Sequence, residues 1–101
     1  MAIERPVDIL PAVMAMHETL TATLPPLSLS DGTCYRNLRD WVRRAMERDL
    51  ELNADLPQRV LALAVEAKAT GGIKNPRAYF VTLLRRDLGY RPGAHKPSRT
   101  K

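Results

Sequence analysis

One group of residues in this 101-residue chain that could bind an anion lies around a helix start. Gly71-Gly72 ends one predicted helix and Asn75-Pro76 begins the next, with Lys74 and Arg77 beside the new start. Backbone N–H groups at a helix start have no intrahelical partner and attract anions. Cations at this position oppose the helix dipole, so Lys74 and Arg77 have only a weak structural explanation. We therefore predict that both contact an anionic partner.

A second group of arginines lies in a predicted helix earlier in the chain. Arg36, Arg39 and Arg43 fall in one sector of that helix and could lie along a phosphate backbone. Acidic residues are interleaved with them, and Asp40 and Glu47 stand at spacings that allow ion pairs along the helix. A salt-bridged surface helix is therefore the alternative interpretation.

Arg85 and Arg86 lie near the end of the last predicted helix, where cations favour the helix dipole. They are explained structurally, but they also add positive charge to the helix that begins beside Lys74 and Arg77. The predicted nucleic-acid-binding residues are Lys74, Arg77, Arg85, Arg86, Arg36, Arg39 and Arg43.

Catalytic residue types are sparse in this sequence. His95 lies near the C-terminus, and His17 falls on an apolar helix face, where a half-buried structural histidine is the simpler interpretation. Cys34 has no clear base partner, and as the only cysteine it excludes an intrachain disulfide and a cysteine-based zinc cluster. There is no phosphate-binding glycine loop. We expect no enzyme activity, no cofactor and no metal site.

The net charge is +5 and the isoelectric point is about 9.9, a balance that favours anionic partners. Residues 91–101 carry four cations and no acid, so subtracting these four from +5 leaves +1 for residues 1–90. The last eleven residues also contain proline and glycine but few apolar residues. We therefore predict a helical domain over residues 1–90 and a flexible basic tail over residues 91–101.

The apolar runs are far shorter than the roughly 20 residues that span a bilayer. The N-terminus lacks a basic region followed by a continuous apolar run, so no signal peptide is predicted. We expect a cytoplasmic protein without membrane contact.

Four helices account for the apolar pattern, within residues 6–24, from about 33 to 50–52, over 55–70 and over 75–88. Pro11 fits the first turn of the first helix, proline follows a capping residue in the third and fourth, and Gly89 is the expected stop. The predicted inward residues are Leu10, Val13, Met14, His17, Leu20 and Leu24, then Tyr35, Leu38, Trp41, Val42, Ala45 and Met46, then Leu56, Val60, Leu63, Ala64 and Ala67, and finally Phe80, Leu83, Leu84 and Leu88. The sequence thus predicts an all-α protein, a small four-helix bundle.

One segment resembles a known family, namely Gly71-Gly72-Ile73-Lys74-Asn75-Pro76-Arg77-Ala78-Tyr79-Phe80 followed by Leu83-Leu84-Arg85-Arg86. It is similar to the closing segment of replication-initiation proteins from plasmids, phages and integrative elements, and of the related DnaD-type domains. In those proteins a helix leads into an (I/V)-(K/S/R)-N-P-x-x-Y turn and a final helix follows. The match covers roughly Val60 to Arg86. The resemblance implies a helical replication or DNA-remodelling module that contacts DNA or a helicase-loading partner.

Two functional hypotheses follow. The first is a nucleic-acid-associated helical module, in DNA replication or maintenance of a mobile element. The alternative is a non-enzymatic protein–protein adaptor or inhibitor that binds an acidic partner surface, with Tyr35, Trp41 and Tyr79 as candidate anchors, because aromatic residues and arginine dominate binding hot spots. Formation of a homodimer through exposed apolar helix faces is compatible with either.

Overall fold

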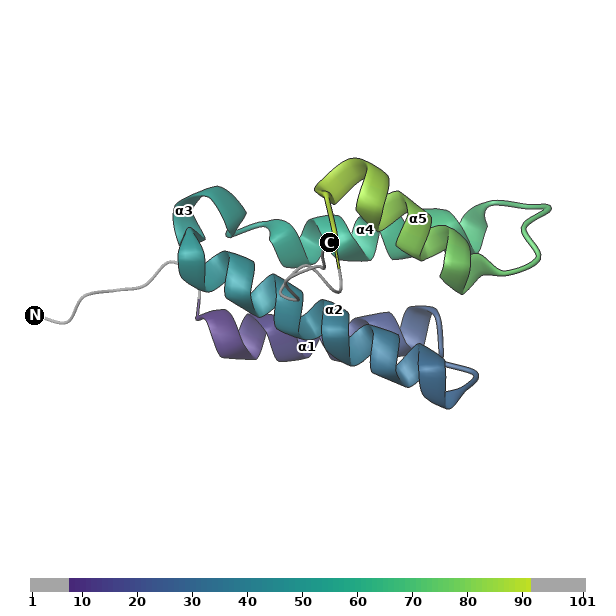
Figure 1. Cartoon of the computed structure of the whole chain (residues 1–101), viewed down its shortest axis with the longest axis horizontal. Coiled ribbons are helices and arrows are strands. Elements are labelled where there is room, and N and C mark those ends of the chain that lie inside the picture. The colour runs from purple at the N-terminus through teal and green to yellow at the C-terminus, as the bar shows by residue number, and fades with distance from the viewer. Residues whose placement is uncertain (1–7, 92–101) are drawn as a thin grey trace, which may run out of the picture.

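The computed structural model describes residues 8–91 and is built of helices (Figure 1). The elements are α1 (Ile9–Thr23), α2 (Leu29–Arg48), α3 (Leu50–Asn53), α4 (Leu56–Ala69) and α5 (Pro76–Leu88). Within this range no strand is present, and α3 is a single helical turn. The predicted all-α bundle of four helices is thereby confirmed. Residues 92–101, which hold almost all of the predicted basic tail, lie outside the described range.

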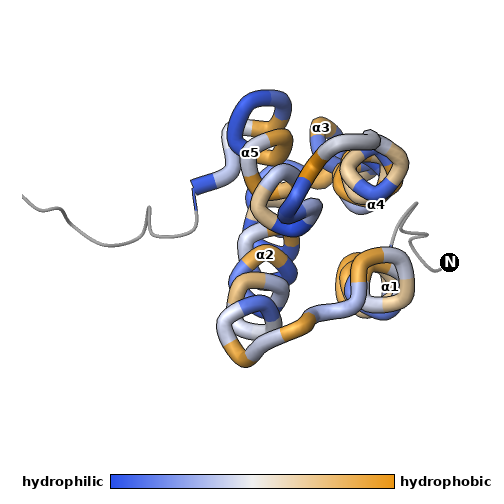
Figure 2. Tube along the Cα trace, turned by 90° about the vertical axis from the view of Figure 1, so that its right-hand side faces the viewer, coloured by the Kyte–Doolittle hydropathy of each residue, from blue (hydrophilic) through white to orange (hydrophobic). Residues whose placement is uncertain are grey.

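The four long helices form two antiparallel hairpins, α1 with α2 and α4 with α5, and α3 connects them (Figure 1). α1 packs against both α2 and α4, and α4 packs against α5. The view along the long axis shows the same arrangement, with α1 and α4 on one side and α2 and α5 on the other (Figure 2). As a result α1 and α4 run in the same direction.

Local signals explain where most helices begin and end. Ser28 and Asn75 cap α2 and α5 by accepting the N–H groups of Asp31 and Ala78, each at 3.1 Å. Pro11 stands in the first turn of α1, where its missing N–H costs nothing. Gly89 ends α5 in the left-handed conformation, with φ 72°. The predicted boundaries at Pro11, Asn75 and Gly89 are confirmed. The predicted start of the second helix near residue 33 is wrong, because Ser28 caps the helix and α2 begins at Leu29.

The end of the second helix differs from the prediction of residues 50–52. α2 stops at Arg48 because the Asp49 side chain accepts the N–H of Leu52 at 3.1 Å and so begins α3. The Asn53 side chain then donates to the carbonyl groups of Ala45 and Asp49, each at 3.0 Å. The Asp49 side chain thus satisfies an N–H that a continuous helix would have paired, while the Asn53 amide is a second donor to two carbonyls that already accept the N–H groups of Asp49 and Asn53.

The predicted inward face of the first helix is wrong in part. Val13, Leu20 and Leu24 are buried as expected, but Met16 is buried in place of Met14. Leu10 and Met14 are 57% and 43% exposed, and His17 is half-buried. Since α1 packs against α4 as well as α2, its inward face is turned toward Met16. The buried residues of the other three helices follow the prediction closely, with Trp41 and Leu88 at the edge of the core.

Two aromatic pairs join α2 to the α5 hairpin. The rings of Tyr35 and Phe80 meet edge to face with centroids 6.4 Å apart, and those of Trp41 and Tyr90 do so at 5.1 Å. Tyr90 is 1% exposed, although it follows the helix stop and no apolar pattern predicts its burial. Its N–H donates to the carbonyl of Leu84 at 3.2 Å, so the left-handed turn at Gly89 folds the chain back onto α2.

Tyr35 connects three elements. Its hydroxyl donates to the carbonyl of Leu24 at 2.7 Å, at the end of α1, while its ring contacts Phe80 of α5. The side chain is buried, and burial raises the pKa of Tyr35 to about 12. Tyr35 was also a candidate partner anchor, and its burial in this fold rules that role out.

Removal of the Tyr35 hydroxyl should destabilise the fold. In the Tyr35→Phe variant the Leu24 carbonyl loses its buried donor, and we expect the free energy of unfolding to fall by about 1–3 kcal/mol. Tyr90→Phe is the matched control, because Tyr90 is equally buried and its hydroxyl has no partner among residues 8–91. That variant should be neutral or slightly stabilising. Urea unfolding measures both, and equal losses would contradict this assignment.

Stability should also fall at alkaline pH. Burial is the main reason that the pKa values of Tyr35 and Tyr90 are raised from 10.0 to about 12. The folded state therefore holds these protons more tightly than the unfolded state does. Their contribution is complete below pH 10 and is lost as the pH rises from 10 to 12. Urea unfolding across this range should show the loss, and the Tyr35→Phe/Tyr90→Phe double variant should show a smaller one.

Candidate functional site

Arg77 has an internal role in this fold. Its Nε donates to the Pro25 carbonyl at 2.6 Å and lies 4.0 Å from Oδ2 of Asp31, and its side chain is 17% exposed. The same Asp31 oxygen accepts the N–H of Leu27 at 2.9 Å. Arg77 therefore ties the start of α5 to the loop between α1 and α2. The positive charge of Arg77 opposes the dipole of α5, and this was the reason for predicting an anionic partner. Asp31 and the Pro25 carbonyl, both within the fold, stabilise that charge instead.

The other three predicted cations of the α5 hairpin are exposed. Lys74 and Arg85 make no ion pair within the described part of the chain, while Arg86 is held by Asp87, its neighbour, at 2.8 Å. Arg85 lies close enough to Cys34 to oppose the rise in that thiol's pKa, which burial and then Asp31 produce. Arg85, which belongs to α5, therefore lies near the face of α2 that carries Cys34. A thiol with a raised pKa is a poor nucleophile at neutral pH.

Arg36, Arg39 and Arg43 lie on the flank of α2 that faces α1. At 100° per residue they occupy one sector of the helix, about half a turn from Cys34 and Trp41. Arg43 and Arg44 both bond to Asp40, at 3.0 and 2.9 Å. Arg36 donates to the Thr33 hydroxyl at 3.1 Å, and neither Arg36 nor Arg39 has an ion pair within residues 8–91.

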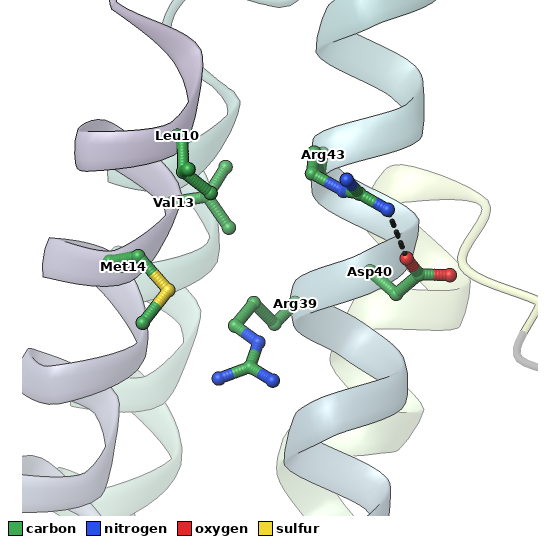
Figure 3. A pocket seen from close by; sticks show the side chains of 6 residues that line it. All are labelled: Leu10, Val13, Met14, Arg39, Asp40 and Arg43. Atoms are coloured by element: carbon green, nitrogen blue, oxygen red, sulfur yellow. Dashed lines mark hydrogen bonds and ion pairs between the residues drawn. The ribbon is translucent and has the colours of Figure 1, made fainter.

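A groove of about 260 Å³ lies between α1 and α2, and we call it the α1–α2 groove. Exposed Leu10 and Met14 form its α1 wall, and Arg39 reaches toward them from α2, while Arg43 turns toward Asp40 (Figure 3). It is lined by Leu10, Val13, Met14, Arg39, Asp40 and Arg43. The groove thus places aliphatic side chains beside arginines.

The flank of α2 beside α1 is electropositive. The pKa of His17 is lowered, first by burial and then by the charges of Arg39 and Arg36, while Glu18 opposes the shift. Nδ1 of His17 is buried and has no hydrogen-bond partner among residues 8–91. Arg36 and Arg39 therefore lie near the part of α1 that carries His17.

A second groove, of about 520 Å³, lies among α2, α3, α4 and α5. Trp41 and the 70%-exposed Leu52 contribute apolar surface. Its charged residues balance, since its lining includes two arginines and two aspartates. It is lined by Trp41, Ala45, Arg48, Asp49, Leu52, Asn53, Leu56, Arg59, Asp87 and Leu88. Trp41, a predicted partner anchor, is half-buried here, and Tyr79 is half-buried on α5.

The seven predicted contact residues therefore do not form one surface. Arg36, Arg39 and Arg43 share the flank beside α1, and Arg85 stands across α2 from them. The apolar wall of the groove was not predicted from the sequence, because the apolar pattern assigned Leu10 and Met14 to the core. The available signal was that α1 carries more large apolar residues than one face can bury.

Compared with protein-family models, curated proteins and solved structures, the chain gives no significant match. Among residues 8–91 there is no group of three or more histidine, cysteine or acidic residues placed to hold a metal ion. The helices of that region are also too short or too polar to cross a membrane.

Arg77 and Lys74 should differ in their effect on stability. Arg77→Ala removes a charge-assisted hydrogen bond and leaves the partly covered Asp31 without its cation, so we expect a loss of about 1–2 kcal/mol. Lys74→Ala, at an exposed position with no ion pair or side-chain hydrogen bond among residues 8–91, should change stability by less than about 0.5 kcal/mol. Thermal and urea unfolding of both variants measure the difference. An Arg77→Ala variant as stable as Lys74→Ala would contradict the stabilising role of the Arg77 contacts with Pro25 and Asp31.

Proposed function

We propose that this protein is a non-enzymatic binding module that holds an acidic segment of a protein partner in the α1–α2 groove. The observation that carries this proposal is the joint presence of Leu10 and Met14, both exposed, beside Arg39 and Arg43. A phosphate backbone would use the arginines but leave the aliphatic wall without a partner. A protein segment with both apolar and acidic side chains uses both.

The size of the groove favours side chains of a partner over a small molecule. Sites for small molecules enclose about 300–1,000 Å³ and bury most of the ligand. The α1–α2 groove, at about 260 Å³, is smaller and open to solvent. One or two apolar side chains of a protein segment would fill it.

The charges of the groove are suited to carboxylates. Arg39 has no ion pair in the described region, and Arg36 adds a second cation near His17. Asp40 is already held by two arginines, Arg43 and Arg44. An incoming carboxylate would therefore meet net positive charge. Paired charges of this kind chiefly determine specificity and the rate of association.

Nucleic-acid association is the second candidate, in replication or maintenance of a mobile element in the cytoplasm. It is supported by the resemblance over residues 60–86, by the exposed cations Lys74 and Arg85, and by the four cations of residues 91–101. The described region itself is close to neutral, with 12 cations and 10 acidic residues among residues 8–91. The acidic-segment proposal therefore comes first.

Selection from a random peptide library tests the first proposal. Displayed peptides should be enriched in Asp and Glu together with Leu, Ile or Phe, because the groove offers arginines and an aliphatic wall. Enrichment should disappear with the Arg39→Gln/Arg43→Gln variant. The matched control is Arg48→Gln/Arg59→Gln, which removes two arginines from the second groove and should select the same peptides.

The contrary outcome is a failure to enrich any acidic sequence while the protein remains folded. If duplex DNA is then bound with an affinity that falls steeply between two salt concentrations, the second candidate replaces the first. Loss of DNA binding in Lys74→Gln/Arg85→Gln, and not in Arg39→Gln/Arg43→Gln, would assign the contact to the α5 hairpin.

A further inference from the structure

We infer that the occupant of the α1–α2 groove is an acidic amphipathic helix, which packs along α1 and α2 as an additional helix of the bundle. This inference rests on the proposed function, because both concern the same groove. It adds the secondary structure of the partner segment and the pattern of its side chains.

A partner segment in helical form is the one that the fold of residues 8–91 can best accommodate. Strand addition requires an exposed sheet edge, and residues 8–91 contain no strand. Recognition of a polyproline helix uses grooves lined by aromatic rings, whereas the α1–α2 groove is lined by aliphatic and charged residues. A helix laid in a groove between two helices needs only apolar side chains one turn apart.

The spacing of the groove residues matches this geometry. Leu10 and Met14 are four residues apart on α1, and Arg39 and Arg43 are four residues apart on α2. Each pair therefore spans about 6 Å along its helix axis, which is about one turn. Rows of side chains four residues apart form the ridges that pack into the grooves of a neighbouring helix. Val13, 1% exposed, closes the base between the two rows.

The charges place the acidic side of the partner helix. Arg36 extends the arginine row toward the start of α2, so Arg36 and Arg39 could pair with carboxylates one turn apart on the partner. Arg43 can also turn to the partner, because Arg44 still holds Asp40 at 2.9 Å. The second groove has no such preference, since its two arginines are balanced by Asp49 and Asp87.

Two displayed libraries of identical composition test the inference. One places Leu at helical positions i, i+4 and i+7 with Glu and Asp on the adjoining face, and the other alternates the same residues at the period of a strand. We expect the helical library to be enriched. Its best peptide should gain helical circular dichroism when it binds, with one peptide per protein.

Variants should identify both walls of the groove. Leu10→Gln/Met14→Gln and Arg36→Gln/Arg39→Gln should each weaken binding of the selected peptide about tenfold or more. Val65→Gln, at an α4 residue that is also 57% exposed, and Arg48→Gln/Arg59→Gln should leave it within about twofold.

Enrichment of the alternating library alone would overturn the helical occupant and leave the proposed acidic partner in place. Enrichment of neither library would overturn both. The inference also fails if the protein alone forms a dimer that Leu10→Gln/Met14→Gln abolishes, because a second copy of the chain would then occupy the groove. Sedimentation of wild type and variant at about 100 μM measures that outcome.

Discussion

The hydrogen bond from the Tyr35 hydroxyl to the Leu24 carbonyl joins the end of α1 to α2 inside the core of the bundle. A buried hydroxyl without a partner costs free energy, and this bond removes that cost for Tyr35. The bond holds the end of α1 over α2, while the Tyr35 ring packs on Phe80 of α5. Arg77 adds a second connection at the same end by donating to Pro25. Both contacts constrain the loop between α1 and α2, and with it the position of α1.

The position of α1 in turn produces the candidate site. With the end of α1 held at Leu24 and its inward face shared between α2 and α4, Met16 enters the core and Met14 remains outside. Leu10, one turn earlier, is exposed for the same reason. On the facing flank of α2, Arg36 and Arg39 lie outside the core and have no acidic partner in the described region. The fold thereby leaves an aliphatic row opposite a basic row.

Much of the fold could be predicted from the sequence because its signals are local. Ser28, Asn75 and Gly89 act on backbone groups within four residues, and helical periodicity identifies Leu38, Val42 and their neighbours as inward. The inward face of α1 could not be chosen locally, since Met14 and Met16 both continue an apolar stripe. That choice depends on packing against α4, which is more than thirty residues away.

The candidate site was likewise predictable only where its residues are related by local helical spacing. The common sector of Arg36, Arg39 and Arg43 follows from helical spacing alone. By contrast, the partner of Arg77 is a carbonyl 52 residues away, so its structural role could not be read from the charge beside a helix start. The burial of Tyr90 could not be predicted from local sequence either, because it depends on contact with Trp41, which is distant in the sequence.

The central claim is that α1 leaves Leu10 and Met14 unburied beside the arginines of α2. Nuclear magnetic resonance of methyl-labelled protein in the presence of a soluble paramagnetic probe tests it most directly. The Leu10 and Met14 methyl groups should relax strongly, whereas those of Met16 and Leu20, which are 1% and 0% exposed, should relax little. Protection of Met14 together with strong relaxation of Met16 would contradict it, because α1 would then face the core as its sequence pattern first suggested.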